Sequence, residues 1–130
     1  MLARALLVVA GLAASATARA GDVEILAAEL RRASGDGWSI EVTLRHADTG
    51  WEHYADAWRV VTADGTVLGT RTLYHPHVDE QPFTRGLGGV VVAPGVEAIW
   101  IEAHDKVHGW SAQRLRIDLR GAGDRMRVTR

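Results

Sequence analysis

Two histidines flank a proline at the start of the stretch from His75 to Arg85, which reads HPHVDEQPFTR. Pro76 fixes its own φ and pushes the residue before it into an extended conformation, so His75 and His77 are expected to point to the same side of the chain. Two imidazoles on one side of a short segment can bind one metal ion. The competing interpretation is a well-ordered connection whose histidines hydrogen-bond to the backbone.

Alternating apolar and polar residues predict the half-buried strands that would position these side chains. The clearest alternation runs from Trp38 to Arg45, and further strands are expected over residues 22–32, 55–62, 66–74, 89–93, 97–103 and 112–119. The stretch 22–32 also fits a helical face, and the strand is the preferred interpretation. Seven short strands, separated by turn signals, predict an all-β fold, a seven-stranded antiparallel immunoglobulin-like β-sandwich.

Successive strands of such a sandwich run in opposite directions, so every second connection lies at the same end. The connections 34–37, 63–65 and 94–96 contain no histidine. The connections 47–54, 75–88 and 105–111, with the strand ends beside them, contain all the histidines of the chain: His46, His53, His75, His77, His104 and His108. The sequence therefore predicts that the histidines gather at one end, in loops of the kind that commonly carry function.

Imidazole and carboxylate ligands without sulfur suit Cu(II), Zn(II) or Ni(II), and the chain contains no cysteine. We expect a Cu or Zn site formed by His75 and His77 together with His104 or His108, with His46 and His53 as the next candidates. Metal-bound imidazoles usually donate their second nitrogen to a carboxylate or carbonyl. The carboxylates expected in that role are Asp48, Asp56, Asp105 and Glu80.

The same loops carry side chains of the types that are enriched in interface hot spots, namely Trp51, Tyr54, Phe83, Arg85 and Trp110. The competing hypothesis is a module that binds an exported protein partner through this end without metal. Trp38, Trp58 and Trp100 lie within predicted strands and are assigned to the core. Metal and partner binding can coexist in a protein of metal delivery or assembly.

Enzyme chemistry is the weaker alternative. Ser111 or Thr49 would need a nearby histidine, and the chain contains no G-x-S-x-G elbow. Asp79 and Glu80 are adjacent, so on extended backbone they point apart, unlike the carboxylate pair of a glycosidase. The glycines at 86, 88 and 89 lack the lysine and following helix of a P-loop. Hydrolytic zinc chemistry would need three histidines and an open ligand position.

Residues 1–20 have the pattern of a secretory signal peptide, with Arg4 before an apolar run and an A-x-A cleavage site ending at Ala20. At about ten residues, that run is shorter than the about 20 that a membrane span needs. Cleavage would leave 110 residues with 13 basic and 16 acidic side chains, a net charge of −3. This balance argues against nucleic-acid binding. We expect an exported protein, periplasmic or extracellular, with one domain over 21–120 and a frayed basic tail over 121–130.

Three stretches resemble those of a family of small exported bacterial proteins: HADTGWEHYAD at 46–56, HPHVDEQPFTR at 75–85 and AHDKVHGW at 103–110. The resemblance extends over most of the chain beyond residue 20. No activity is established for that family. The resemblance implies one folded, exported domain and assigns no roles to individual residues.

Overall fold

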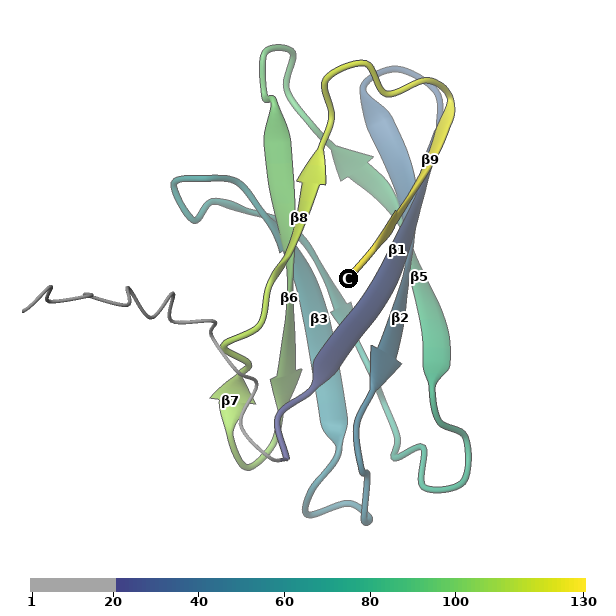
Figure 1. Cartoon of the computed structure of the whole chain (residues 1–130), viewed down its shortest axis with the longest axis vertical. Coiled ribbons are helices and arrows are strands. Elements are labelled where there is room, and N and C mark those ends of the chain that lie inside the picture. The colour runs from purple at the N-terminus through teal and green to yellow at the C-terminus, as the bar shows by residue number, and fades with distance from the viewer. Residues whose placement is uncertain (1–20) are drawn as a thin grey trace, which may run out of the picture.

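The computed structural model describes residues 21–130, and the predicted signal peptide, residues 1–20, lies outside this range. The described part contains nine strands and no helix (Figure 1). The strands are β1 (Glu24–Arg32), β2 (Gly37–Arg45), β3 (Ala55–Val61), β4 (Val67–Thr72), β5 (Phe83–Val91), β6 (Ala98–Asp105), β7 (Gly109–Trp110), β8 (Leu115–Asp118) and β9 (Arg125–Thr129). The predicted strand over 22–32 is confirmed as β1.

The strands form two antiparallel sheets, one in the order β5-β2-β1-β9 and the other in the order β4-β3-β6-β7, with β8 also paired to β6. The two sheets face each other as the layers of a β-sandwich (Figure 1). The number of strands in the described residues exceeds the predicted seven, because a two-residue strand, β7, and the C-terminal β9 were not anticipated. The immunoglobulin-like topology stays a prediction.

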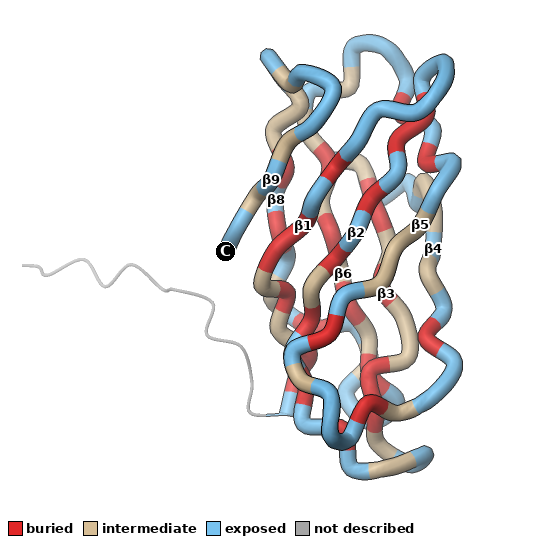
Figure 2. The backbone as a smooth tube through the Cα atoms, turned by 90° about the vertical axis from the view of Figure 1, so that its right-hand side faces the viewer, coloured by how far each residue is buried: buried red, intermediate tan, exposed pale blue. Residues whose placement is uncertain are grey.

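The core lies between the sheets and consists of the inward-facing residues of both (Figure 2). Val42 of β2, Trp58 of β3 and Ile101 of β6 have no exposed surface. Full burial of a large apolar side chain contributes about 1.5–3 kcal/mol. Because side chains alternate along a strand, burial of these residues fixes which face of the sheet every other residue of the strand occupies, up to the strand ends.

The C-terminal segment differs from the frayed tail that was predicted over 121–130. Arg125–Thr129 forms β9, which pairs antiparallel with residues 27–31 of β1. Met126 lies opposite Leu30, and it is partly buried against the core. The prediction was wrong because the arginines of this segment occupy the outward face of an edge strand, whereas the apolar side chains between them face inward.

Two strand details also differ from the predictions. Trp100 of β6 was assigned to the core, but it is only partly buried, and the guanidinium of Arg114 lies 5.2 Å from its ring centroid. Strand β5 begins at Phe83 rather than near Gly89, because Phe83 pairs opposite Leu44 of β2. Glycines in this strand interrupt the apolar alternation that would have revealed it.

The connections after β2, β4 and β6 lie at a common end of the sandwich, the lower end in Figure 1. His46 follows β2, His53 precedes β3, His75 and His77 follow β4, and His104 and His108 lie at and after the end of β6. The predicted gathering of the histidines at one end is therefore confirmed. The described chain also begins at this end (Figure 1), and the carbonyl of Gly21 contacts His46 there.

Candidate functional site

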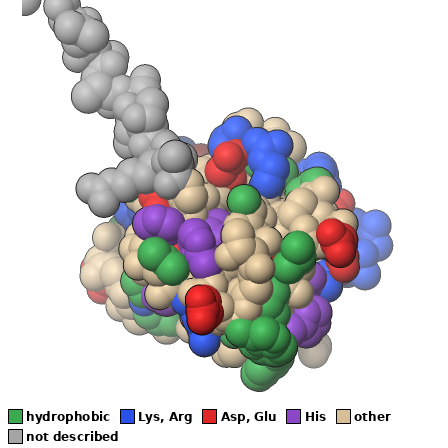
Figure 3. Space-filling view, turned by 90° about the horizontal axis from the view of Figure 1, so that it is seen from below, with side chains coloured by type: hydrophobic (Ala, Val, Ile, Leu, Met, Phe, Trp, Pro, Cys, Tyr) green, Lys and Arg blue, Asp and Glu red, His purple; other side chains and the backbone are tan. Residues whose placement is uncertain are grey.

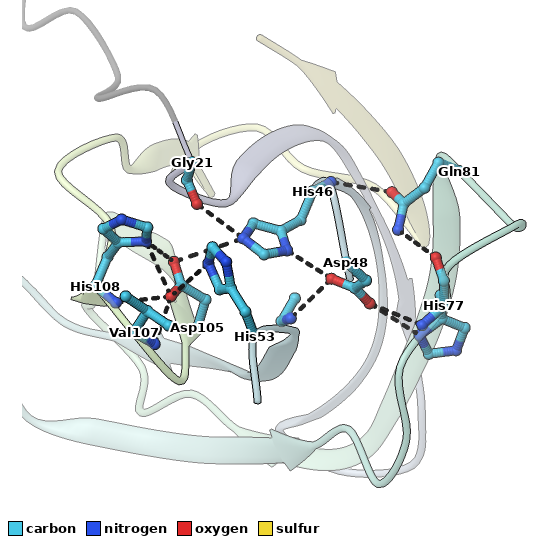
Figure 4. Close-up of polar contacts among 10 residues, drawn as sticks. Gly21, His46, Asp48, His53, His77, Gln81, Asp105, Val107 and His108 are labelled. Carbon is cyan, nitrogen blue, oxygen red and sulfur yellow. Dashed lines mark hydrogen bonds and ion pairs between the residues drawn. The ribbon is translucent and has the colours of Figure 1, made fainter. Parts of the chain in front are cut away.

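Asp105, the last residue of β6, has no exposed surface and forms the centre of the histidine-bearing end. Its carboxylate accepts hydrogen bonds from the backbone N–H groups of Val107 at 2.8 Å and His108 at 2.7 Å (Figure 4). Nδ1 of His108 lies 3.1 Å from each oxygen. Burial opposes ionisation, but these hydrogen bonds outweigh it and hold the pKa of Asp105 below its usual range. The carboxylate is therefore charged at neutral pH.

Two more imidazoles face this carboxylate. Nε2 of His46 lies 3.7 Å from Oδ2 of Asp105, and Nε2 of His53 lies 3.4 Å from Oδ1. Within the described chain, Nε2 of His53 is buried and has no hydrogen-bond partner. A buried polar atom without a partner is uncommon in folded proteins and calls for an explanation.

His46 is held from its other side by Asp48, and neither side chain is exposed. Its Nδ1 donates to Oδ1 of Asp48 at 2.5 Å, and its Nε2 donates to the carbonyl oxygen of Gly21 at 2.8 Å. Asp48 also accepts from the backbone N–H groups of Ala55 at 3.0 Å and His77 at 2.7 Å. Oxygen acceptors therefore hold the ring of His46 at both of its nitrogens.

A tight turn brings His53 back to His46. The N–H of His53 donates to the carbonyl of Gly50, and the N–H of Thr49 donates to the carbonyl of His53. Gly50 has a φ of 151°, which glycine adopts without a Cβ penalty. As a result, the rings of His46 and His53 meet edge to face with their centroids 4.8 Å apart.

Potential ligand atoms form two groups among residues 21–130, and each has its donors within 4.8 Å of one another. One group contains His46, His53 and Asp105, and the other contains Asp22, Asp105 and His108. Asp105 belongs to both groups, so these five residues form one continuous cluster, called the Asp105 cluster below. A compact set of imidazole and carboxylate donors of this kind can hold a borderline transition-metal ion.

His75 and His77, the ligands expected first, belong to neither group. Their rings are neighbours with centroids 4.6 Å apart, in line with the expected effect of the intervening proline. However, Nε2 of His77 accepts a hydrogen bond from Nη2 of Arg85 at 2.9 Å, and its ring stacks on Phe83. Burial, helped by the Arg85 charge, lowers the pKa of His77, so this ring is neutral. The guanidinium disfavours a second cation at that nitrogen.

His104 is also separate from the Asp105 cluster. Its Nδ1 donates to Oδ1 of Asp56, and its ring lies edge-on to Trp110 at 4.9 Å between centroids. Asp56 thus holds an imidazole, but that imidazole is in neither group of potential ligands. Glu80, another expected carboxylate partner of a histidine, instead pairs with Arg85 at 3.4 Å.

The five side chains that were expected to contact a partner differ in exposure. Tyr54 is 6% exposed, and Phe83, the first residue of β5, is 2% exposed and belongs to the core, so both side chains are largely covered. Trp110 is partly exposed beneath the guanidinium of Arg59, 3.6 Å from its ring centroid. Trp51 is 65% exposed. Figure 3 shows hydrophobic side chains beside histidines on this end of the molecule.

The start of the described chain also contributes to this end of the molecule. Asp22 is 8% exposed and belongs to the Asp105 cluster, and the carbonyl of Gly21 binds His46. Both residues follow the predicted cleavage site directly, and no motif in the sequence points to them. Asp105 was expected to support a metal-bound histidine, but its position makes it a candidate ligand itself.

Among curated proteins, one from Halomicrobium mukohataei named "Putative lipoprotein" is 34% identical over 104 residues. The match covers 80% of this chain and 51% of that protein, so the chain spans about half the length of its relative. No protein-family model matches the sequence. No solved structure matches it either. Within residues 21–130 there is no helix long and apolar enough to cross a membrane.

Proposed function

We propose that this protein binds a divalent transition-metal ion, Zn(II) or Cu(II), through Nε2 of His46, Nε2 of His53 and the carboxylate of Asp105. The observation that carries the proposal is the Nε2 atom of His53, which is buried without a hydrogen-bond partner in the described chain and faces Asp105 at 3.4 Å. Tetrahedral ligands with bonds of about 2.0–2.2 Å lie roughly 3.3–3.6 Å apart. The separations of His53 and His46 from Asp105, 3.4 and 3.7 Å, are close to that spacing.

The contacts of His46 support the same assignment. Its Nδ1 donates to Asp48, which is the carboxylate–histidine arrangement that commonly orients a metal-binding imidazole. To bind an ion, Nε2 must be the unprotonated nitrogen of the ring and must leave the carbonyl of Gly21. Metal ions and protons compete for a ligand nitrogen, so metal binding is expected to weaken in acid, as it does at other histidine sites.

Further donors surround the shared carboxylate. Asp22 and His108 have ligand atoms within 4.8 Å of each other and of Asp105, so they form a second possible ligand set that shares this carboxylate. Mixed nitrogen and oxygen donors suit both Zn(II) and Cu(II), and Cu(II) binds such donors more tightly.

An exported binding protein fits these observations better than an enzyme. The name of the relative from Halomicrobium mukohataei describes a lipoprotein, and this name supports the export that we infer from the sequence of residues 1–20. The proposed role is metal binding outside the cytoplasm, in the delivery of an ion or in assembly.

Calorimetric titration of the exported chain with ZnCl2 or CuSO4 at pH 7.5 tests the proposal. We expect one ion to bind with a Kd below about 10 μM. His53→Ala should weaken binding by at least about a hundredfold, since it removes a direct ligand. His75→Ala is the matched control, because His75 is exposed and outside the cluster. Equal binding by wild type and His53→Ala, with both folded by circular dichroism, would overturn the proposal.

A second candidate function is the binding of an exported protein partner through the same end without metal. It is supported by two apolar side chains in adjacent loops, Trp51 and Val107, which are 65% and 60% exposed. A purified partner that binds in the presence of EDTA and is lost with Trp51→Ala would favour this function. Loss of that partner with EDTA alone would favour the metal site.

A further inference from the structure

Gly21 is built into the Asp105 cluster, although in the sequence it directly follows the predicted cleavage site. Its carbonyl oxygen accepts the hydrogen bond from Nε2 of His46 at 2.8 Å (Figure 4). Its Cα lies against His108, since a Cβ placed there would come within 2.8 Å of Cε1 of that ring. Its φ of 92° also favours glycine. Both faces of the residue therefore contact candidate ligands.

The residues after Gly21 hold it in this position. Asp22 is 8% exposed and Val23 has no exposed surface. The N–H of Ile25 donates to Oε1 of Gln113 at 2.7 Å, and Nε2 of Gln113 donates back to the carbonyl of Ile25 at 2.8 Å. This paired contact fixes the start of β1 against the loop before β8. The position of Gly21 is thus a consequence of the fold.

We propose that cleavage after Ala20 makes the α-amino group of Gly21 a further ligand of the ion, so that the site is complete only in the processed chain. This inference rests on the proposed metal-binding function. Standard bond lengths place the nitrogen of a residue within about 3.6 Å of its own carbonyl oxygen. The nitrogen of Gly21 therefore lies within about 6.5 Å of Nε2 of His46, given the 2.8 Å hydrogen bond.

Cleavage changes the chemistry of this nitrogen. In the intact chain it belongs to a peptide bond, in which its lone pair is delocalised over the carbonyl and is a poor metal ligand. After hydrolysis of that bond, the neutral amine has a free lone pair, and nitrogen donors of this kind suit Cu(II) and Zn(II). The amine and the carbonyl oxygen of Gly21, once released by His46, can together close a five-membered chelate ring.

Three forms of the chain test the inference by calorimetric titration with Zn(II) and Cu(II) at pH 7.5. They are the processed chain, whose N-terminus must be Gly21 by mass spectrometry, the same chain acetylated on that amine, and a chain that begins at Ala20. We expect the acetylated and extended forms to bind the ion at least about tenfold more weakly. About tenfold is the smaller of the losses in metal affinity that are typical when a group beside a bound metal is substituted. Thermal melts without metal should coincide, which excludes a loss of folding.

A spectroscopic measurement identifies the ligand directly. With 15N-glycine incorporated, the Cu(II) complex of the processed chain should show coupling to a 15N nucleus in electron–nuclear double resonance, and the acetylated form should lack it. Equal affinities of all three forms, with His53→Ala still impaired, would overturn the role of the amine and leave the proposed function standing. Absence of binding to every form would overturn both the proposed function and the role of the amine. A mature protein that starts at a residue other than Gly21 would overturn the role of the amine alone.

Discussion

His46 and Asp48 lie two residues apart, and Nδ1 of the imidazole donates to Oδ1 of the carboxylate at 2.5 Å with neither side chain exposed. The contact fixes the ring plane, so that Nε2 is directed toward Gly21 and Asp105. Asp48 also binds the backbone N–H of His77, so one carboxylate positions the Asp105 cluster and the loop after β4 together.

The first prediction concerns this carboxylate. Asp48→Asn should lower Zn(II) affinity by about 10- to 100-fold, because the imidazole loses the anionic acceptor that orients it. Asp56→Asn provides the control, since Asp56 accepts a hydrogen bond from His104 outside the cluster. Titration calorimetry should show a normal affinity for the control. An equal loss in both variants would mean that the effect is a general one on folding.

The second prediction concerns pH. The pKa of His77 is lowered from 6.5 by burial and the charge of Arg85, so the folded state favours the neutral ring. The stability that this preference contributes is present above pH 6.5 and is lost as the pH falls through 6.5 toward the lower folded-state pKa. The loss from this residue is at most about 1.4 kcal/mol per pH unit.

Urea denaturation at pH 7.5 and 5.5 measures this effect. Wild type should lose more stability between the two values than His77→Gln does, whatever the absolute stability of the variant. His75→Gln should keep the wild-type difference, because His75 is exposed. An unchanged pH dependence in His77→Gln would remove His77 as a source of acid sensitivity.

The third prediction concerns the C-terminal strand. Deletion of residues 124–130 should lower stability by several kcal/mol, because it uncovers β1 and the side chains that pack against Met126 and Val128. In a domain of this size, each kcal/mol corresponds to about 4–8 °C in Tm. Thermal melts provide the measurement, and an unchanged Tm would restore the original prediction of a frayed tail.

The fourth prediction concerns metal removal. Free Zn(II) at 100 times its Kd should stabilise the folded chain by about 2.7 kcal/mol, provided that the unfolded chain does not bind it. EDTA should reverse the rise in Tm, and His53→Ala should show little rise at the same Zn(II) concentration. A Tm that does not respond to metal in wild type would contradict a site that exists only in the folded state.

The strand faces could be predicted because burial follows a period of two. Trp38, Ile40, Val42 and Leu44 alternate in the sequence and are all buried in β2. Counting the strands also predicted the common end of the histidine-bearing loops, because an even number of reversals returns the chain to the same end. These inferences depend on local spacing, which one sequence displays directly.

The grouping of the ligands could not be predicted, because it depends on how the loops fold. His75 and His77 are the natural pair by spacing, yet neither belongs to a group of potential ligands, and Arg85, eight positions beyond His77, binds Nε2 of that ring. His53 reaches His46 through a turn at Gly50, which alternation does not describe. Asp22 enters the cluster through the path of the chain before β1.

Strand β9 forms an edge of its sheet, with Arg125 and Arg127 on its exposed face. The free backbone groups of an edge strand can pair with a second molecule and extend the sheet into an ordered aggregate. A copy that approached β9 in antiparallel fashion would bring arginines close to arginines, and like charges across a strand pair are unfavourable. The same basic side chains therefore oppose fibril growth from this edge at high concentrations of the exported protein.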